Sequence, residues 1–447
     1  MLKTTKPVQA EPWSTSVATH RWWFVPPTFI LAPVAASFAA WIVLRVRVAV
    51  MGKPASWEGL AGFAEPEEPT VEGLVLLVTW YLAVTMLAYL GWRLAAPAPR
   101  RAGSALTHSA SFERRYFQIV LVTAAIGVGY AYYQITSSYS IVESLTSQTA
   151  NDFSNALSGF AGPQTLRYAT ILAAPIGIYL WRKKVVGWPY PVAAVLLLLM
   201  NAMITSRLGL LMAVCVYLAL WVKSSVRPLS PRVGDPRRVV AIVGMVAVLF
   251  GALTALNYSR NANYYREAGV SNPISMNLYQ MGAYLAVPAQ TSIGVSNAVM
   301  HGEWEYAGGP AYSIDAIKPT FLQFDKVRKD EGKDESFYNY SVTFEPSFIT
   351  NSVFADKYGE YGWWGWFYTI LAYGAAGYLF GRLMRFGTII AGSAGVMVYS
   401  FSEVWRTQML NNGIVMFLLL LTGGAALLAT MAERYSGRSR VRRSPSV

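Results

Sequence analysis

Charge, cysteine and histidine are all scarce in this chain of 447 residues, and each scarcity excludes a class of protein. Only 14% of the residues are charged and 54% are hydrophobic, whereas soluble domains carry nearer a quarter charged residues. The one cysteine, Cys215, lies in an apolar run and cannot form an internal disulfide, so we interpret it as a packing residue. Three histidines are too few to predict a metal site built on histidine.

The sequence also lacks the short motifs of common catalytic sites. It has no Walker loop, no His-Glu-x-x-His, no Gly-x-Ser-x-Gly, and no Asp-x-Asp of the kind that holds a metal-bound nucleotide sugar. We therefore predict neither a metal nor another cofactor. The N-terminal residues are polar and have no apolar core, so we expect no cleavable signal peptide, and the first apolar stretch must direct insertion.

Long apolar stretches are what the sequence does contain. A helix that spans a membrane needs about 20 mostly apolar residues. Ten stretches approach this length, near 22–44, 72–94, 117–135, 166–182, 190–205, 208–222, 239–256, 361–381, 388–401 and 413–431. They predict an all-α, polytopic membrane protein of about ten transmembrane helices. Its parts are helices 1–7 in residues 1–256, a large outer segment in 257–360, and helices 8–10 with a basic tail in 361–447.

The distribution of basic residues predicts the orientation, because cytoplasmic loops are rich in Lys and Arg. With the N-terminus inside, the inner segments hold 23 of the 37 basic residues and only 4 of the 24 acidic ones. We therefore predict a multi-pass protein of the bacterial inner membrane with both termini inside. The basic clusters have no interleaved aromatic residues, so nucleic acid is not an expected partner. Attraction to anionic lipid of the bilayer explains them.

The segment 257–360 interrupts the apolar sequence and holds 12 of the 24 acids. Two arginines and three tyrosines lie just beyond the membrane at its start: Arg260, Arg266, Tyr258, Tyr264 and Tyr265. Residues 274–300 are moderately apolar, and they predict either an amphipathic helix along the interface or a re-entrant piece. Another outer loop, 136–165, is rich in Ser, Thr, Asn, Gln and Tyr, which suits either contact with sugars or simple solvation.

Five arginines are expected around the outer membrane boundary: Arg167, Arg207, Arg260, Arg266 and Arg406. A polyanionic headgroup that leaves a membrane carrier needs such cations, and the planar guanidinium binds phosphate oxygens in pairs. For Arg207, at the tip of a short helical hairpin, contact with lipid headgroups is an equally good interpretation.

A carboxylate could deprotonate an attacking sugar hydroxyl. The candidates are Glu345, Asp356 and Glu403, and the sequence does not choose between them. Glu403 and Arg406 are three residues apart, so on a helix they could share a face.

Several short motifs recur in an order that resembles a known family. They are an outer loop rich in Ser, Asn and Gly before an arginine-led span; Thr205-Ser206-Arg207-x-Gly209; Gly308-Gly309-Pro310 through Ile317-Lys318-Pro319 to Glu345; and Tyr358-Gly359-x-Tyr361-Gly362. Over about 130–430 the chain resembles the O-antigen polymerase class of oligosaccharide repeat-unit polymerases, within it the enterobacterial common antigen polymerase branch.

The resemblance implies a GT-C-like helical bundle and a metal-independent glycosyltransferase. Such proteins join undecaprenyl-diphosphate-linked repeat units, donor and acceptor, at the outer face of the inner membrane. It assigns the essential arginines to Arg207 first, then to Arg260 or Arg266, then to Arg406. We add Glu345 and Glu403 as catalytic candidates. For substrate binding the candidates are Arg167, Tyr258, Tyr264, Tyr265 and Lys318.

Three alternatives stay open. A ligase of the O-antigen type would transfer the glycan to another acceptor and would need His301 in its outer segment. A flippase for the same lipid would act by transport, although we find no inverted repeat. The third alternative is a non-catalytic scaffold, and the binding of a chain-length regulator is also left open.

Overall fold

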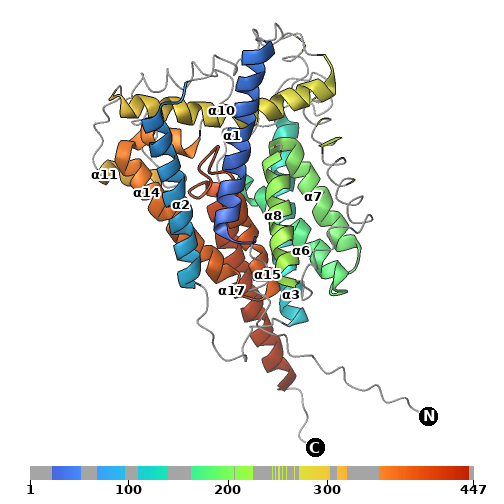
Figure 1. Ribbon diagram of the computed structural model, residues 1–447. Coiled ribbons are helices and arrows are strands. Elements are labelled where there is room, and N and C mark those ends of the chain that lie inside the picture. Colours follow the sequence, from blue (N-terminus) through green and yellow to red (C-terminus); the bar gives the residue numbers. More distant parts are fainter. Residues whose placement is uncertain are drawn as a thin grey trace, which may run out of the picture.

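The computed structural model describes residues 23–51, 68–95, 109–138, 163–205, 207–224, 271–302, 310–319 and 352–441, with single positions at 244, 247, 250, 251, 254, 258 and 266. All regular structure in these ranges is helical (Figure 1). This agrees with the all-α class predicted from the apolar stretches. Each expected stretch except 239–256 coincides with described helix, and 239–256 lies mostly outside the described residues.

Among the described residues, four helices are long and apolar enough to cross a membrane: α1 (Pro26–Met51), α2 (Val71–Ala95), α3 (Ala110–Ser138) and α17 (Gly413–Val441). Shorter apolar helices include α7 (Pro189–Thr205) and α8 (Arg207–Ser224). A helix pairs all its interior backbone groups within itself, which an apolar solvent demands. These helices support a helical membrane protein, and the number of spans stays a prediction.

The outward faces of the long helices are apolar. On α2 the exposed side chains include Val75, Val78, Leu82 and Met86, at helical spacing. A soluble protein would cover such a stripe with polar residues or another element. The stripe therefore suits contact with lipid tails.

Glycines bring α2 and α14 (Val353–Leu383) unusually close. A Cβ atom at Gly91 would lie 2.0 Å from the Gly374 carbonyl oxygen, and one at Gly377 would lie 2.0 Å from the Ala88 carbonyl oxygen. Small residues allow such backbone contact between helices in a membrane, where packing drives association. The pair α2–α14 is therefore a fixed frame for what lies at its ends.

A second close pair joins α8 to α16 (Ala394–Ser402), which follows the short α15 (Thr388–Gly392). A Cβ atom at Gly395 would lie 2.3 Å from Val216 Cα, and one at Gly392 would lie 2.7 Å from Leu220 Cδ2. The two helices run in opposite directions in this register. The end of α16 therefore reaches the level of the first turn of α8, where Arg207 stands.

Helix α10 (Pro273–Met300) lies across the upright helices near one end of the bundle (Figure 1). Residues 286–298 are buried throughout, so this stretch has no wet face. An amphipathic helix lying along the interface, one of the two structures expected from the sequence, therefore does not describe its second half. The reason is tertiary, because α1, α2 and α14 all contact this helix.

Polar side chains fasten α10 in place. Ser37 Oγ of α1 donates a hydrogen bond to the Leu285 carbonyl oxygen at 2.6 Å. Asn297 Oδ1 accepts from Thr70 Oγ1 at 2.8 Å, and its Nδ2 donates to the Glu68 carbonyl oxygen at 2.8 Å. Charge-free hydrogen bonds of this kind are suited to a buried helix, because they leave no unpaired charge.

The opposite end of the bundle collects basic helix ends. We call it the basic end, defined by Arg93, Arg182, Lys223, Arg382 and Arg385, and we call the other end the α10 end. Lys223 Nζ at the end of α8 donates to the Met384 carbonyl oxygen just after α14, at 2.7 Å. These residues belong to the expected inner segments, and in the described helices they lie at the same end of the bundle. Which side of a membrane that is remains a prediction.

Candidate functional site

The turn between α16 and α17, residues 403–412, organises the α10 end. We call it the 403–412 loop. Its backbone folds tightly, because the Arg406 and Thr407 N–H groups both donate to the Glu403 carbonyl oxygen, at 2.8 and 2.7 Å. Val353 N, in the first turn of α14, donates to the Val404 carbonyl oxygen at 3.4 Å. The loop is thus bound to the point where the chain returns from segment 257–360.

Glu403 and Arg406 form an ion pair within this loop. Arg406 Nη2 lies 2.7 Å from Glu403 Oε2, and Arg406 Nε donates to the same oxygen at 2.8 Å. The glutamate side chain is 9% exposed and the arginine side chain 21% exposed. Burial opposes the positive charge, but the carboxylate outweighs it and holds the pKa of Arg406 above its ordinary value. The arginine is therefore a permanent cation whose side chain stays partly exposed.

Tyrosines surround the pair. The Arg406 guanidinium carbon lies 5.7 Å from the centroid of the Tyr284 ring, which α10 supplies. Tyr399, one turn before Glu403, and Tyr373 of α14 both interact electrostatically with the Glu403 carboxylate. A cation held between a carboxylate and an aromatic face keeps one orientation. The Glu403–Arg406 pairing expected from sequence spacing is present, although in a turn rather than in a helix.

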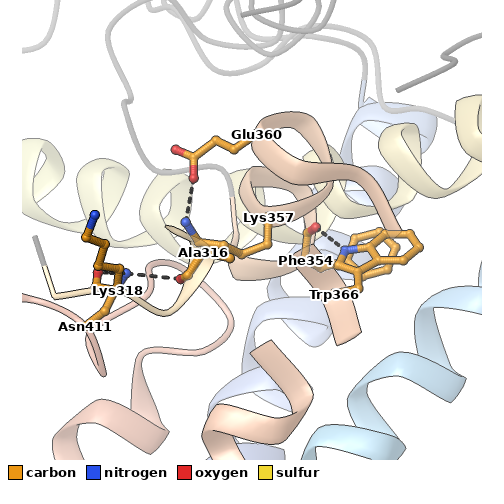
Figure 2. A network of polar contacts seen from close by, with 7 residues as sticks. All are labelled: Ala316, Lys318, Phe354, Lys357, Glu360, Trp366 and Asn411. Atoms are coloured by element: carbon orange, nitrogen blue, oxygen red, sulfur yellow. Dashed lines mark hydrogen bonds and ion pairs between the residues drawn. The ribbon is translucent and has the colours of Figure 1, made fainter. Parts of the chain in front are cut away.

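Two amide side chains of the loop make further contacts. Gln408 Oε1 accepts a hydrogen bond from the Tyr373 hydroxyl at 3.3 Å. Asn411 Nδ2 donates to the Ala316 carbonyl oxygen at 3.1 Å and to that of Lys318 at 3.4 Å (Figure 2). Lys318, a residue expected to bind substrate, therefore lies beside the loop, just after η4 (Ile314–Ala316).

Sequence reasoning missed Lys357, which is buried near the start of α14 with 7% of its surface exposed. Its Nζ lies 2.5 Å from Glu360 Oε2 (Figure 2). The same atom lies 5.2 Å from the centroid of the Tyr361 ring. The same turn holds Asp356, a half-buried candidate base. The only signal was a lysine where α14 begins, and nothing in the sequence showed that it would be buried.

A kink at Gly362 separates this first part of α14 from the rest of the helix. Gly362 has φ 60° and ψ −151°, a backbone conformation that essentially only glycine adopts. The Ser313 hydroxyl of α11 (Pro310–Ser313) donates to the Tyr361 carbonyl oxygen at 3.1 Å and so pairs a carbonyl at the kink. The Tyr-Gly-x-Tyr-Gly motif is therefore the place where α14 bends.

Arg167 lies in η3 (Pro163–Ala169), directly before α6 (Thr170–Arg182), and is 7% exposed. Gly127 of α3 allows this close approach, because a Cβ atom there would lie 2.1 Å from Arg167 N. Nη2 donates to the Tyr168 hydroxyl at 3.2 Å, whereas Nε and Nη1 are buried and have no hydrogen-bond partner within the described part of the chain. Unpaired buried donors are costly, and an anion would satisfy them.

For the other predicted site residues the structure describes fewer contacts, or none. Arg207 begins α8, level with the end of α16, and its backbone alone is described. Arg266 Nη2 donates to the Tyr258 hydroxyl at 2.8 Å, with the guanidinium carbon 5.5 Å from that ring. His301 is the exposed residue that caps the C-terminus of α10. Four further candidates lie outside the described residues: Arg260, Tyr264, Tyr265 and Glu345.

The described residues contain no group of three or more His, Cys, Asp or Glu side chains that could hold a metal ion. The 403–412 loop brings together a paired arginine and two amides, with tyrosines of α10 and α14 in contact with it. A second buried arginine, Arg167, lies in η3. Comparison with protein-family models, with curated proteins and with solved structures finds no match to this chain.

Proposed function

We propose that the protein is a metal-independent membrane glycosyltransferase that polymerises undecaprenyl-diphosphate-linked oligosaccharide repeat units. It acts at the outer face of the bacterial inner membrane, with the α10 end outside and both termini inside. The resemblance of the sequence to repeat-unit polymerases supports this reaction. The observation that carries the proposal is the partly exposed, permanently charged Arg406, fixed by Glu403 and Tyr284 at the end of the bundle away from the basic helix ends.

In this mechanism Arg406 binds the diphosphate of the donor. The acceptor hydroxyl oxygen attacks the anomeric carbon, the bond from that carbon to the diphosphate oxygen breaks, and a carboxylate takes the hydroxyl proton. The electron pair of the broken bond leaves with undecaprenyl diphosphate. A guanidinium already in place stabilises this growing negative charge without reorganisation, and such stabilisation is commonly the largest catalytic term.

Glu403 fits the role of orienting Arg406 better than that of the base. Arg406 Nε and Nη2 both bind the Oε2 atom of Glu403. If Glu403 took up a proton, the ion pair that positions Arg406 for the leaving group would weaken. Asp356, half-buried at the start of α14, and Glu345 stay the alternative bases. Arg167 and Arg207 are proposed as further cations for the diphosphate.

The test is a reconstitution. The purified protein is given lipid-linked repeat units extracted from the strain that makes them, with a metal chelator present, and the products are separated on a gel. A ladder of lengths that survives the chelator supports a metal-independent polymerase. Arg207→Ala should abolish the ladder while the protein stays in the membrane.

Other products would replace the proposal. A single joined product that is lost in His301→Ala would indicate a ligase. Movement of the lipid across the membrane of a liposome, without a new glycosidic bond, would indicate a transporter. Wild-type chain lengths from Arg207→Ala would remove Arg207 from the site.

A further inference from the structure

Gln408 lies in the 403–412 loop, two residues after Arg406. Two residues span at most about 7 Å between Cα atoms. A group that binds Arg406 therefore brings whatever is covalently attached to it into the neighbourhood of Gln408. The loop itself is held at both ends, by Val353 at Val404 and by Asn411 at the Ala316 carbonyl oxygen.

The carboxamide of Gln408 is held in one orientation. Its Oε1 accepts from the hydroxyl of Tyr373, which is completely buried on α14. Its Nε2 is buried and has no hydrogen-bond partner in the part of the chain that the structure describes. Native proteins leave few buried donors unpaired, and an unpaired one asks for a specific explanation such as a ligand.

A second unpaired group lies on the same face of α14. Thr369 is one turn before Tyr373, and residues four apart share a helix face. Its hydroxyl is fully buried and also has no partner among the described residues. Both unpaired groups are neutral, in contrast to the charged Arg406. Neutral amides and hydroxyls bind neutral oxygens, whereas a second buried anion would need another cation.

We propose that Gln408 is a specificity-determining residue whose Nε2 donates a hydrogen bond to a neutral hydroxyl or carbonyl oxygen of the sugar joined to the diphosphate. Arg406 binds the diphosphate and Gln408 reads the sugar next to it. This inference rests on the proposed function, since it takes its substrate class from there. Two residues of one loop thus bind two different parts of the substrate.

The experiment separates the two roles with two probes. One is undecaprenyl diphosphate, which has no sugar, and the other is the lipid-linked repeat unit extracted from the producing strain. Binding of each probe is measured for the wild-type protein in detergent and for Gln408→Met, which keeps the length of the side chain but has no N–H donor. Thr407→Val is the matched control in the same loop.

Gln408→Met should weaken binding of the repeat unit by about tenfold or more, as expected for a lost hydrogen bond to a buried group, and leave binding of undecaprenyl diphosphate unchanged. Gln408→Ala should do the same, which guards against an effect of the thioether. Arg406→Ala should weaken binding of both probes. Thr407→Val should weaken neither.

Equal loss of both probes in Gln408→Met would mean that the residue only supports the loop, and would overturn the inference. Unchanged binding of both probes would overturn it as well. If the wild-type protein binds the repeat unit and makes a ladder in either case, the proposed function stands and only the role of Gln408 falls. A wild-type protein that neither binds the repeat unit nor elongates it would overturn both.

Discussion

The two ends of the bundle use the same cationic residue types in different surroundings. At the α10 end Arg406 and Lys357 lie largely buried, and each is paired with a carboxylate, Glu403 or Glu360. At the basic end Arg93 and Arg382 are exposed. A buried, paired cation has one geometry, whereas an exposed one samples many and is screened by solvent.

This difference indicates which basic residues are candidates for a catalytic role. Exposed basic residues at helix ends set orientation in the membrane, a role that needs charge but no geometry. Stabilising a leaving group needs a cation held within a fraction of an ångström. Arg406 is held by two contacts with Glu403 in the loop and by one with Tyr284 of α10. Net charge distinguishes the two ends, but it does not show which cation is held in one geometry.

The largest expected difference between the two ends is at Arg406. Arg406→Ala should lower the rate of chain elongation by about 100-fold to 1,000-fold, the cost of removing one group that stabilises transition-state charge. Arg406→Lys keeps the charge but loses the planar fork, so we expect it to restore only part of the rate. The measurement is ladder formation from lipid-linked repeat units.

Arg93→Ala is the control at the basic end, and its rate should stay within about twofold of wild type because the residue is exposed there. Equal losses in the Arg93 and Arg406 variants, at equal amounts of protein in the membrane, would show that elongation depends on charge in general. The distinction between the ends would then be wrong.

The second prediction tests stability at the two ends. Glu403→Gln leaves the Arg406 charge partly buried without a counter-ion, which should lower the free energy of unfolding by about 3 kcal/mol. The pKa of Arg406 is raised in the folded protein, so the stability from its charge is fully present below the ordinary arginine pKa and is lost only above it. The loss in Glu403→Gln should therefore be constant between about pH 6 and pH 9.

Glu433→Gln is the matched change at the basic end. Glu433 Oε1 accepts hydrogen bonds from Ser109 and Ser111, and a glutamine oxygen accepts them too. Its free energy of unfolding should change by less than about 0.5 kcal/mol. Unfolding in detergent by heat or denaturant measures both variants, and a larger loss in Glu433→Gln than in Glu403→Gln would contradict the comparison.

The third prediction concerns the frame between the two ends. Gly377→Ala places a Cβ atom 2.0 Å from the Ala88 backbone oxygen, so α2 and α14 must move apart at a cost of about 1–3 kcal/mol. Gly424→Ala in α17 is the control, since no atom lies within 4 Å of the added Cβ, and alanine favours helix by up to about 1 kcal/mol. In thermal unfolding, Gly377→Ala should lower the melting temperature and Gly424→Ala should raise it.

Elongation adds a second readout to this pair. Because Gly377 lies far along α14 from the site, Gly377→Ala should lose activity only as fast as it loses folded protein. A variant that folds fully and still fails to elongate would mean that α14 transmits strain to the 403–412 loop.

How much of this could be read from the sequence differs between the fold and the site. Apolar stretches of helical length predicted the helices, because their length and composition act locally. They did not predict the burial of residues 286–298, which depends on α1, α2 and α14 packing around α10. The amphipathic interpretation fails there because partners, rather than periodicity, decide exposure.

In the site, spacing alone predicted that Glu403 and Arg406 could meet, since they are three residues apart. Lys357 and Gln408 gave no such signal, because the features that single them out are contacts with Glu360 and Tyr373 and burial by other helices. The expected roles of Arg207, Arg260 and Glu345 stay predictions, since the side chains of these residues lie outside what the structure describes.

The smallest expected effects separate two tyrosine hydroxyls. Tyr217 accepts from Arg182 Nη1 at 2.6 Å on the exposed surface of the basic end, and Tyr373 donates to Gln408 in the interior. Tyr217→Phe should change the free energy of unfolding by less than about 0.5 kcal/mol, because water replaces the lost contact. Tyr373→Phe should cost about 1–2 kcal/mol, because it leaves the Gln408 oxygen buried and unpaired.

Binding of the two probes also distinguishes the two tyrosine variants. Tyr373→Phe frees the Gln408 carboxamide to rotate, so it should weaken binding of the lipid-linked repeat unit while binding of undecaprenyl diphosphate is kept. Tyr217→Phe should affect neither probe. If the Tyr373 variant bound both probes as wild type does, the orientation of Gln408 would not depend on this hydroxyl. The buried contacts of the α10 end would then be no more specific than the exposed ones at the basic end.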